Sequence, residues 1–305
     1  IVAAETSALT VIGVPAIAYG GNLMFIQMII GYVIARVILA IVMVPRYLRG
    51  EIYSPYQLLE THLGRGPRRL AAGLFLFLET LAAGVRVFVA CIPIRLLLGE
   101  QVCSLGGLVD PILGAILLFV GLSLVYTCLG GVKAVIWTDA VQFGLFLGGG
   151  LFALCYIPTL VDGGWNAAFT QAAAAGKLAW LNLDFTLGAP INLWMGLFGG
   201  TVLVLSTHGA EQLIVQRVLA CGTVSDGRKA LGLSAVLIFP LFLVFLLVGA
   251  LLWVFYQGHP FQIPLPEGRP GIKSVDFIFP IFMLTEVPHV LRGGLIVAIL
   301  AAAMS

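Results

Sequence analysis

Long apolar runs separated by short polar breaks dominate this sequence. A helix of about 20 apolar residues crosses a hydrocarbon layer of roughly 30 Å, and the longest runs match that length. We expect membrane-spanning helices at residues 1–20, 23–45, 70–98, 111–129, 137–160, 190–208, 230–256 and 288–305. The pattern predicts an all-α integral membrane protein that crosses the bilayer several times.

The composition supports this interpretation. Hydrophobic residues make up 60% of the 305 residues and charged residues 10%, and the mean hydropathy is +1.08. A soluble domain of this size would need more polar surface to cover itself. The first residues already resemble the inside of an apolar helix and the last ones stop in mid-span, so we expect a fragment of a longer protein. The five cysteines have no metal-like spacing and are interpreted as packing residues.

Positive charges gather in alternate breaks. Arginines are frequent between residues 46 and 69, Lys133 lies in the next such break, and arginine and lysine return before residue 230. The positive-inside rule therefore places residues 46–69 and 210–229 in the cytoplasm, and residues 162–187 and 258–286 outside.

Two of the outer segments have helical character without the length of a span. Residues 163–183 are rich in alanine and carry two tryptophans, which predicts a short helix at the membrane interface. Residues 275–287 are apolar but short and contain Pro280. They form either a lid over the outer mouth or an ordinary surface helix.

Polar residues interrupt the first span. Its polar and helix-weakening positions are Glu5, Thr6, Ser7, Thr10, Gly13 and Pro15. Such residues are costly in a membrane unless they line a cavity, and broken helices bind ions and substrate in secondary transporters. The alternative is a kinked helix whose hydroxyls bond to the preceding turn. Residues 207–209 resemble a second break, and the pairing of first and sixth spans is typical of inverted repeats.

Charged side chains also lie inside spans. Glu79 and Arg86 are seven residues apart in the third span, and Arg36 lies in the second. Either Glu79 forms a structural ion pair with one of these arginines, or the planar guanidinium of Arg86 meets an anionic group of a substrate. His208, at the end of the sixth span, is expected to be packed or hydrogen-bonded rather than to relay protons.

Four stretches resemble the sodium:solute symporter family. They are AAETSALTVIGVPA, YTCLGGVKAVIWTDAVQFGLFLGGG, GAEQLIVQRVLACGTVSDGRKAL and the terminal AAAMS. The second is the most specific, with its GG, apolar pair, aromatic residue, TD and Q. The resemblance implies a LeuT-type inverted-repeat helical bundle, with residues 1–305 as one transporter domain that runs from part of core helix 1 to the start of core helix 8. Residues 1–160 would form the first repeat and residues 161–305 part of the second.

The resemblance also implies a sodium ion at the break of the first helix, between it and the eighth. We expect its ligands to be the carbonyls of Ala3, Thr6 and Ala302 and the hydroxyl of Ser305, because a hard cation requires oxygen ligands and a broken helix exposes carbonyls. The alternative is that AAAMS is only a small-residue packing face. Asp139 is expected to influence sodium release inward, or merely to complement a helix N-terminus.

Substrate contacts are expected at four positions: Ser7, Thr10, Arg86 and Thr207. Sugar-transporting members of the family carry an Asn and a Tyr in the sixth helix, where this chain has Val204 and Thr207, and some carry a Lys in the seventh, where it has Ile238. An organic anion or an amino acid-like metabolite is therefore favoured over a sugar.

Together these features predict a sodium-coupled symporter that imports a small organic solute by alternating access. Its partners would be the solute, Na⁺ and the lipid bilayer of a cell membrane, with no nucleic acid. A membrane enzyme is disfavoured because the four histidines are dispersed along the chain. A transporter-like domain of a sensor protein is an open alternative, whereas paired broken helices favour alternating access over a channel.

Overall fold

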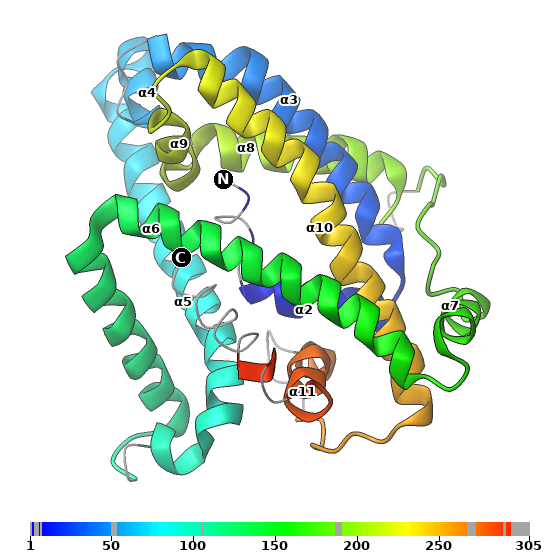
Figure 1. Cartoon of the computed structure of the whole chain (residues 1–305). Helices are drawn as coiled ribbons and strands as arrows, with labels where there is room; N and C mark the ends of the chain where they lie inside the picture. The colour runs from blue at the N-terminus through cyan, green and yellow to red at the C-terminus, as the bar shows by residue number, and fades with distance from the viewer. Residues whose placement is uncertain are drawn as a thin grey trace. The chain divides into compact units, whose positions relative to one another are not determined.

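The computed structural model describes residues 2, 6, 8–49, 54–104, 107–186, 191–266, 273–288 and 291–293, and these residues form helices and connections without a strand. In chain order the elements are α2 (Ala8–Gly20), the 3-10 turn η1 (Leu23–Phe25), α3 (Ile26–Arg49), α4 (Pro55–Leu63), α5 (Arg65–Cys103), α6 (Pro111–Leu160), α7 (Gly164–Ala174), the π-helix η2 (Met195–Gly200), α8 (Thr201–Ala210), α9 (Gln212–Leu219), α10 (Val224–Gly258), the 3-10 turn η3 (Ser274–Phe277) and α11 (Ile278–Thr285) (Figure 1).

Most of the expected spans are confirmed as apolar helices. Among the described residues, the helices long and apolar enough to cross a membrane are Leu23–Arg49, Arg65–Phe88, Trp137–Leu160 and Val224–Gly258. Shorter apolar helices, Thr10–Gly20 and Met195–Ala210, occupy the expected first and sixth spans. The last expected span, 288–305, lies almost entirely outside the described residues.

Helix α6 corrects one prediction. A break was expected around Lys133, but α6 continues without interruption through its 50 residues. At a rise of 1.5 Å per residue it is about 75 Å long, more than twice the thickness of a hydrocarbon core. Figure 1 shows a sharp bend between the teal first part and the green second part. Gly130 and Gly131 lie in the middle of the helix, and glycine pairs permit a bend of this kind while the chain stays helical.

Contacts group the chain into two compact units that are interleaved along the sequence. The first unit contains residues 1–2, 22–81 and 179–243, and the second contains residues 3–21, 82–178 and 244–305. Each unit combines residues from before and after position 160. This division does not test the predicted repeat boundary, which stays a prediction.

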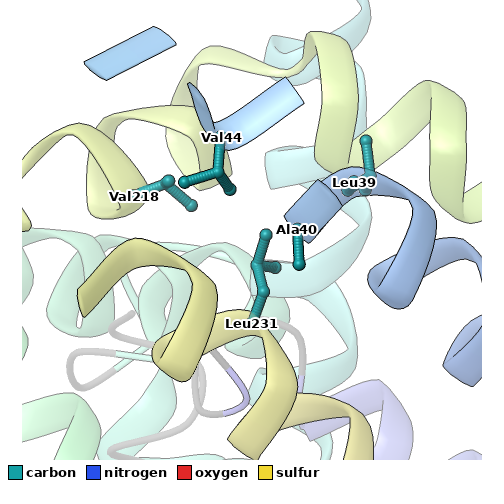
Figure 2. Close-up of a cluster of buried hydrophobic side chains, with 5 residues drawn as sticks. All are labelled: Leu39, Ala40, Val44, Val218 and Leu231. Carbon is teal, nitrogen blue, oxygen red and sulfur yellow. The ribbon is translucent and has the colours of Figure 1, made fainter. Parts of the chain in front are cut away.

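In the first unit, helix α3 meets α9 and α10 through a small apolar cluster. Leu39, Ala40 and Val44 of α3 pack with Val218 of α9 and Leu231 of α10 (Figure 2). All five side chains are at most 9% exposed. The cluster anchors the second half of α3.

The first turns of α3 lie against the π-helix η2 with their backbones almost in contact. A Cβ added at Gly196 would lie 2.6 Å from the carbonyl carbon of Gln27, and one added at Gly200 would lie 2.7 Å from the carbonyl oxygen of Met28. From the α3 side, a Cβ at Gly31 would lie 2.7 Å from the backbone nitrogen of Thr201. Small residues at GxxxG spacing allow such close approach in membranes, and only glycine fits here.

In the second unit, α11 is buried rather than spread on a surface. Residues 278–283 of α11 are all buried, and the helix packs against α2. Phe279 makes an edge-to-face contact with Phe245 of α10 at 6.2 Å between ring centroids, and Phe282 does the same with Phe255 at 5.7 Å. This burial excludes the ordinary surface helix that was one option for residues 275–287. The role as a lid stays a prediction.

The interfacial helix expected at 163–183 is shorter than predicted. Helix α7 ends at Ala174, and Gly176 follows with a positive φ of 69°. A glycine in this left-handed conformation is a usual way to terminate a helix. Residues 179–186 then continue without helical structure.

Candidate functional site

The first span is interrupted where the sequence predicted. Val2 is helical, Thr6 is not, and α2 begins only at Ala8. Thr6 is 1% exposed, so this non-helical backbone is buried. Ala3 and Ser7, together with Ala302 and Ser305 at the far end of the chain, lie outside the described residues. The interruption is confirmed, whereas the proposed sodium ligands are not tested.

A second break is present slightly later than expected, directly after the sixth span. Helix α8 continues through residues 207–209 and ends at Ala210, and Glu211 is extended with φ −74° and ψ 126° before α9 begins. The break is therefore at Glu211 rather than at residues 207–209. The same span begins with the π-helix η2, and π-helical turns are frequent at functional sites.

A buried arginine of α3 holds the end of α8 just before this break. Arg36 is fully buried, and its Nη1 donates to the carbonyl of Tyr32 at 3.0 Å while Nη2 lies 3.4 Å from Nε2 of His208. A guanidinium can only donate, so Nε2 accepts and the histidine proton is on Nδ1. Nδ1 lies 2.9 Å from Oγ1 of Thr207. His208 is thus a hydrogen-bonded packing residue, as expected.

A second α3 side chain fixes the same helix end. The hydroxyl of Tyr47 donates to the carbonyl of Gly209. This carbonyl belongs to the last turn of α8, whose carbonyls lack intrahelical partners. Helix α3 is in turn bonded to α10, because Nε of Arg228 on α10 donates to the carbonyl of Ala40 on α3 at 3.1 Å. The segment before Glu211 is therefore held by α3, and α3 by α10.

Asp139 lies on a buried polar face of α6. Asp139 is 5% exposed and Gln142, one turn later, is 3% exposed, whereas Trp137 and Val141 beside them are 74% and 60% exposed. Because α6 begins at Pro111, Asp139 is in the interior of a helix, and the explanation by a helix N-terminus is wrong. The continuous helix removes the terminus that this explanation required.

Sequence reasoning gave Gln142 no role. Within the part of the chain that the structure describes, its Oε1 has no hydrogen-bond partner. A buried amide oxygen without a hydrogen-bond partner is costly. Its position on the same helical face as the Asp139 carboxylate therefore makes Gln142 a candidate functional residue. The available signal was the spacing of three residues from Asp139, which puts both side chains on one helical face.

The predicted substrate residues are distributed over both units. Thr10 of α2 and Arg86 of α5 are half-buried residues of the second unit, and Thr207 belongs to the first. Nε of Arg86 donates to the carbonyl of Ala82 at 3.4 Å, one turn earlier on the same helix. Thr207 also contacts the carbonyl of Val204 at 3.4 Å. Its hydroxyl therefore takes part in the network that orients His208.

Lys177 holds the other end of the first helix. Its Nζ donates to the carbonyl of Tyr19 at 2.6 Å and to that of Gly21 at 3.0 Å, and it lies 5.0 Å from the ring centre of Trp253. A cation at a helix C-terminus satisfies free carbonyls and complements the helix dipole. Desolvation by burial lowers the pKa of Lys177 from its ordinary value of 10.5. The sequence suggested only a loop charge here.

Comparison with known proteins adds evidence from the whole chain. Residues 1–305 match the model of the sodium:solute symporter family. The chain is 29% identical over 312 residues to the sodium/sialic acid symporter SiaT of Proteus mirabilis (strain HI4320), covering 99% of this chain and 58% of that protein. It is 28% identical over 278 residues to the human sodium/iodide cotransporter, covering 91% of this chain and 41% of that protein.

A solved structure agrees with the fold. It is described as the substrate-bound outward-open state of a Na⁺-coupled sialic acid symporter with a novel Na⁺ site, and it superposes with a TM-score of 0.84 at 26% identity. The match covers 99% of this chain and 60% of that one. The expected LeuT-type helical fold is thereby confirmed. The chain spans about three fifths or less of the length of these relatives.

Proposed function

Because the chain belongs to the sodium:solute symporter family, we propose that the complete protein is a sodium-coupled symporter that imports a small organic solute across a cell membrane by alternating access. The observation that carries this proposal is the pair of helix breaks, one at Thr6 within the first span and one at Glu211, directly after the end of the sixth. Interrupted helices in corresponding positions of two repeats mark the binding region of secondary transporters.

The proposed sodium site lies at the first interruption. Backbone that leaves the helical hydrogen-bond pattern frees carbonyl oxygens, and Thr6 offers such backbone in a buried position. The carbonyls of Ala3 and Ala302 and the hydroxyl of Ser305 complete the proposed ligand set. A set without a formal charge suits an ion that must leave again in each transport cycle.

Asp139 and Gln142 are proposed to assist inward release of the ion. Both side chains are buried on one face of α6, and a carboxylate with a neighbouring amide oxygen attracts a hard cation. Asp139→Asn keeps the shape and removes the charge, so the sodium concentration for half-maximal uptake should rise. The exposed Asp162→Asn is the matched control. An unchanged sodium dependence in Asp139→Asn would remove this residue from the release route.

The proposed solute is an organic anion. Two of the relatives are named for anionic substrates, sialic acid and iodide. In this chain Arg86 supplies a guanidinium, which matches a carboxylate with two parallel hydrogen bonds. Ser7, Thr10 and Thr207 are proposed to add hydroxyl contacts from the first and sixth spans.

Uptake by the full-length protein in proteoliposomes tests the function. Labelled sialic acid, a short monocarboxylate, an amino acid and a neutral sugar are offered with an inward sodium gradient or with potassium in its place. We expect sodium-dependent uptake with preference for an anion, and a raised half-saturation constant in Arg86→Lys. Arg69→Lys, an exposed position of the same helix, is the control. Uptake of every compound at equal rates with sodium and potassium would refute the symporter.

A further inference from the structure

We propose that a groove between the end of α3 and helix α4 binds the headgroup of an anionic phospholipid. The groove has a volume of about 780 Å³, and its lining includes Arg46 and Arg49 of α3 and His62 of α4. This volume is within the range of specific small-molecule sites. All of its lining residues belong to the first unit.

The charges of the groove suit an anion. Arg46 and Arg49 lie in the last turn of α3 and are both exposed. The acidic side chain on α4, Glu60, is engaged elsewhere, by Arg68 and by Arg65 at 3.5 Å. Among the residues that the structure describes, neither groove arginine forms an ion pair with a carboxylate. The groove thus presents two guanidinium groups to an incoming phosphate. A planar guanidinium can bind phosphate through two parallel hydrogen bonds.

Apart from Thr61, the rest of the groove lining is apolar, which favours a lipid over a free phosphate. Met43 of α3 and Leu58 and Leu59 of α4 line it. Just before the groove, α3 exposes Ile41 at 62% and Val42 at 40%. Acyl chains can follow this apolar face while the headgroup occupies the basic end of the groove.

The predicted topology leads to the same ligand. The positive-inside rule places the end of α3 and all of α4 on the cytoplasmic side, where anionic lipids attract clusters of basic residues next to a span. Helix α4 begins with a Ser54 cap and Pro55 at its first position, so it is a defined helix beside the span. Leu58 and Leu59 of this helix line the groove, and Arg65 and Arg68 follow the helix in sequence.

Native mass spectrometry of the full-length protein, purified from bilayers of phosphatidylcholine with phosphatidylglycerol, tests the proposal. The wild-type protein should retain at least one phosphatidylglycerol. Arg46→Gln/Arg49→Gln should retain it about tenfold less well, with phosphatidylcholine unchanged. The control Arg217→Gln/Lys229→Gln removes two cations from the same predicted side, outside the groove, and should behave as wild type.

Two further measurements separate the alternatives. Leu59→Glu places a carboxylate in the groove wall and should lower phosphatidylglycerol retention while both arginines remain. Excess glycerol phosphate should not displace the lipid. Equal retention in wild type and the arginine double variant would overturn the proposal. So would an equal loss in the control, which would indicate general surface charge, or full displacement by glycerol phosphate, which would indicate a site for free anions.

Discussion

The contact between α3 and the π-helix η2 makes a strong prediction about glycine. Gly196 faces α3 so closely that a methyl group there would lie 2.6 Å from the carbonyl carbon of Gln27, and nearer still to its oxygen. Ordinary contacts of a Cβ are 3.4–4 Å. Gly196→Ala must therefore separate the two helices by about 1 Å, since the obstacle is backbone and cannot rotate away.

Two opposing effects determine the size of the change. Overpacking of this kind costs about 1–3 kcal/mol. Replacing a helical glycine by alanine returns about 0.5–1 kcal/mol through lower backbone entropy of the unfolded chain. The steric cost is larger, so we expect Gly196→Ala to lower the free energy of unfolding by about 1–2 kcal/mol.

Gly199 provides a matched control in the same six-residue element. It is exposed, and the nearest atom to an added Cβ is Cγ of Met195 at 3.8 Å. Gly199→Ala should therefore be neutral or slightly stabilising. Unfolding of the full-length protein in micelles by increasing denaturing detergent, followed by tryptophan fluorescence, measures both variants against wild type.

The double variant Gly31→Ala/Gly196→Ala examines whether one interface is responsible. Both methyl groups would force the same helix pair apart, so the combined loss should be smaller than the sum of the single losses. Equal stability of Gly196→Ala and Gly199→Ala would refute the reasoning. Strict additivity in the double variant would show that the two glycines act at separate contacts.

Three other outcomes are expected. Arg36→Lys should lower the free energy of unfolding by about 1–3 kcal/mol, because lysine cannot reproduce both the hydrogen bond to the Tyr32 carbonyl and that to His208. A denaturation curve identical to that of the wild type would contradict this network. Burial and then the negative charge of Asp226 raise the pKa of the Cys221 thiol from its ordinary 9.0, so less thiolate is present at a given pH. The pH at which its alkylation rate increases should therefore be higher than for an exposed thiol introduced by Arg65→Cys. Identical pH profiles for the two thiols would contradict the raised pKa. With native cysteines removed, an impermeant maleimide should label Arg65→Cys and Asp162→Cys from opposite sides of the membrane, and labelling of both from one side would refute the predicted topology.

The spans were predictable because hydrophobic length alone defines them. The helix break near Thr6 was predictable for a related reason, since polar side chains within an apolar run are rarely tolerated without a structural purpose. The continuity of α6 was not predictable in this way. Lys133 and the two glycines before it have a composition that is typical of a loop. The backbone hydrogen bonds of a helix can nevertheless continue through such residues, as they do in α6.

The long-range contacts were beyond the reach of the sequence. Arg36 and His208 are 172 positions apart, and nothing in either segment indicates the other. The spacing of Gly196 and Gly200 was visible and is a known sign of helix packing, but it does not identify the partner helix. For the candidate site, the sequence suggested a role for Asp139 that stays a prediction, and only the structure showed that this residue lies inside a helix with Gln142 on the same face.

The unbroken course of α6 has a consequence for how the chain can be cut and tagged. Proteases and inserted sequences require a backbone that can leave its hydrogen bonds, and a helix resists both along its length. Residues 130–136 would be an obvious insertion point from composition, yet they lie within this helix. The non-helical, exposed residues 183–186 are a better place for an epitope tag or an engineered cleavage site. Cleavage there would leave both arms of α6 on one fragment.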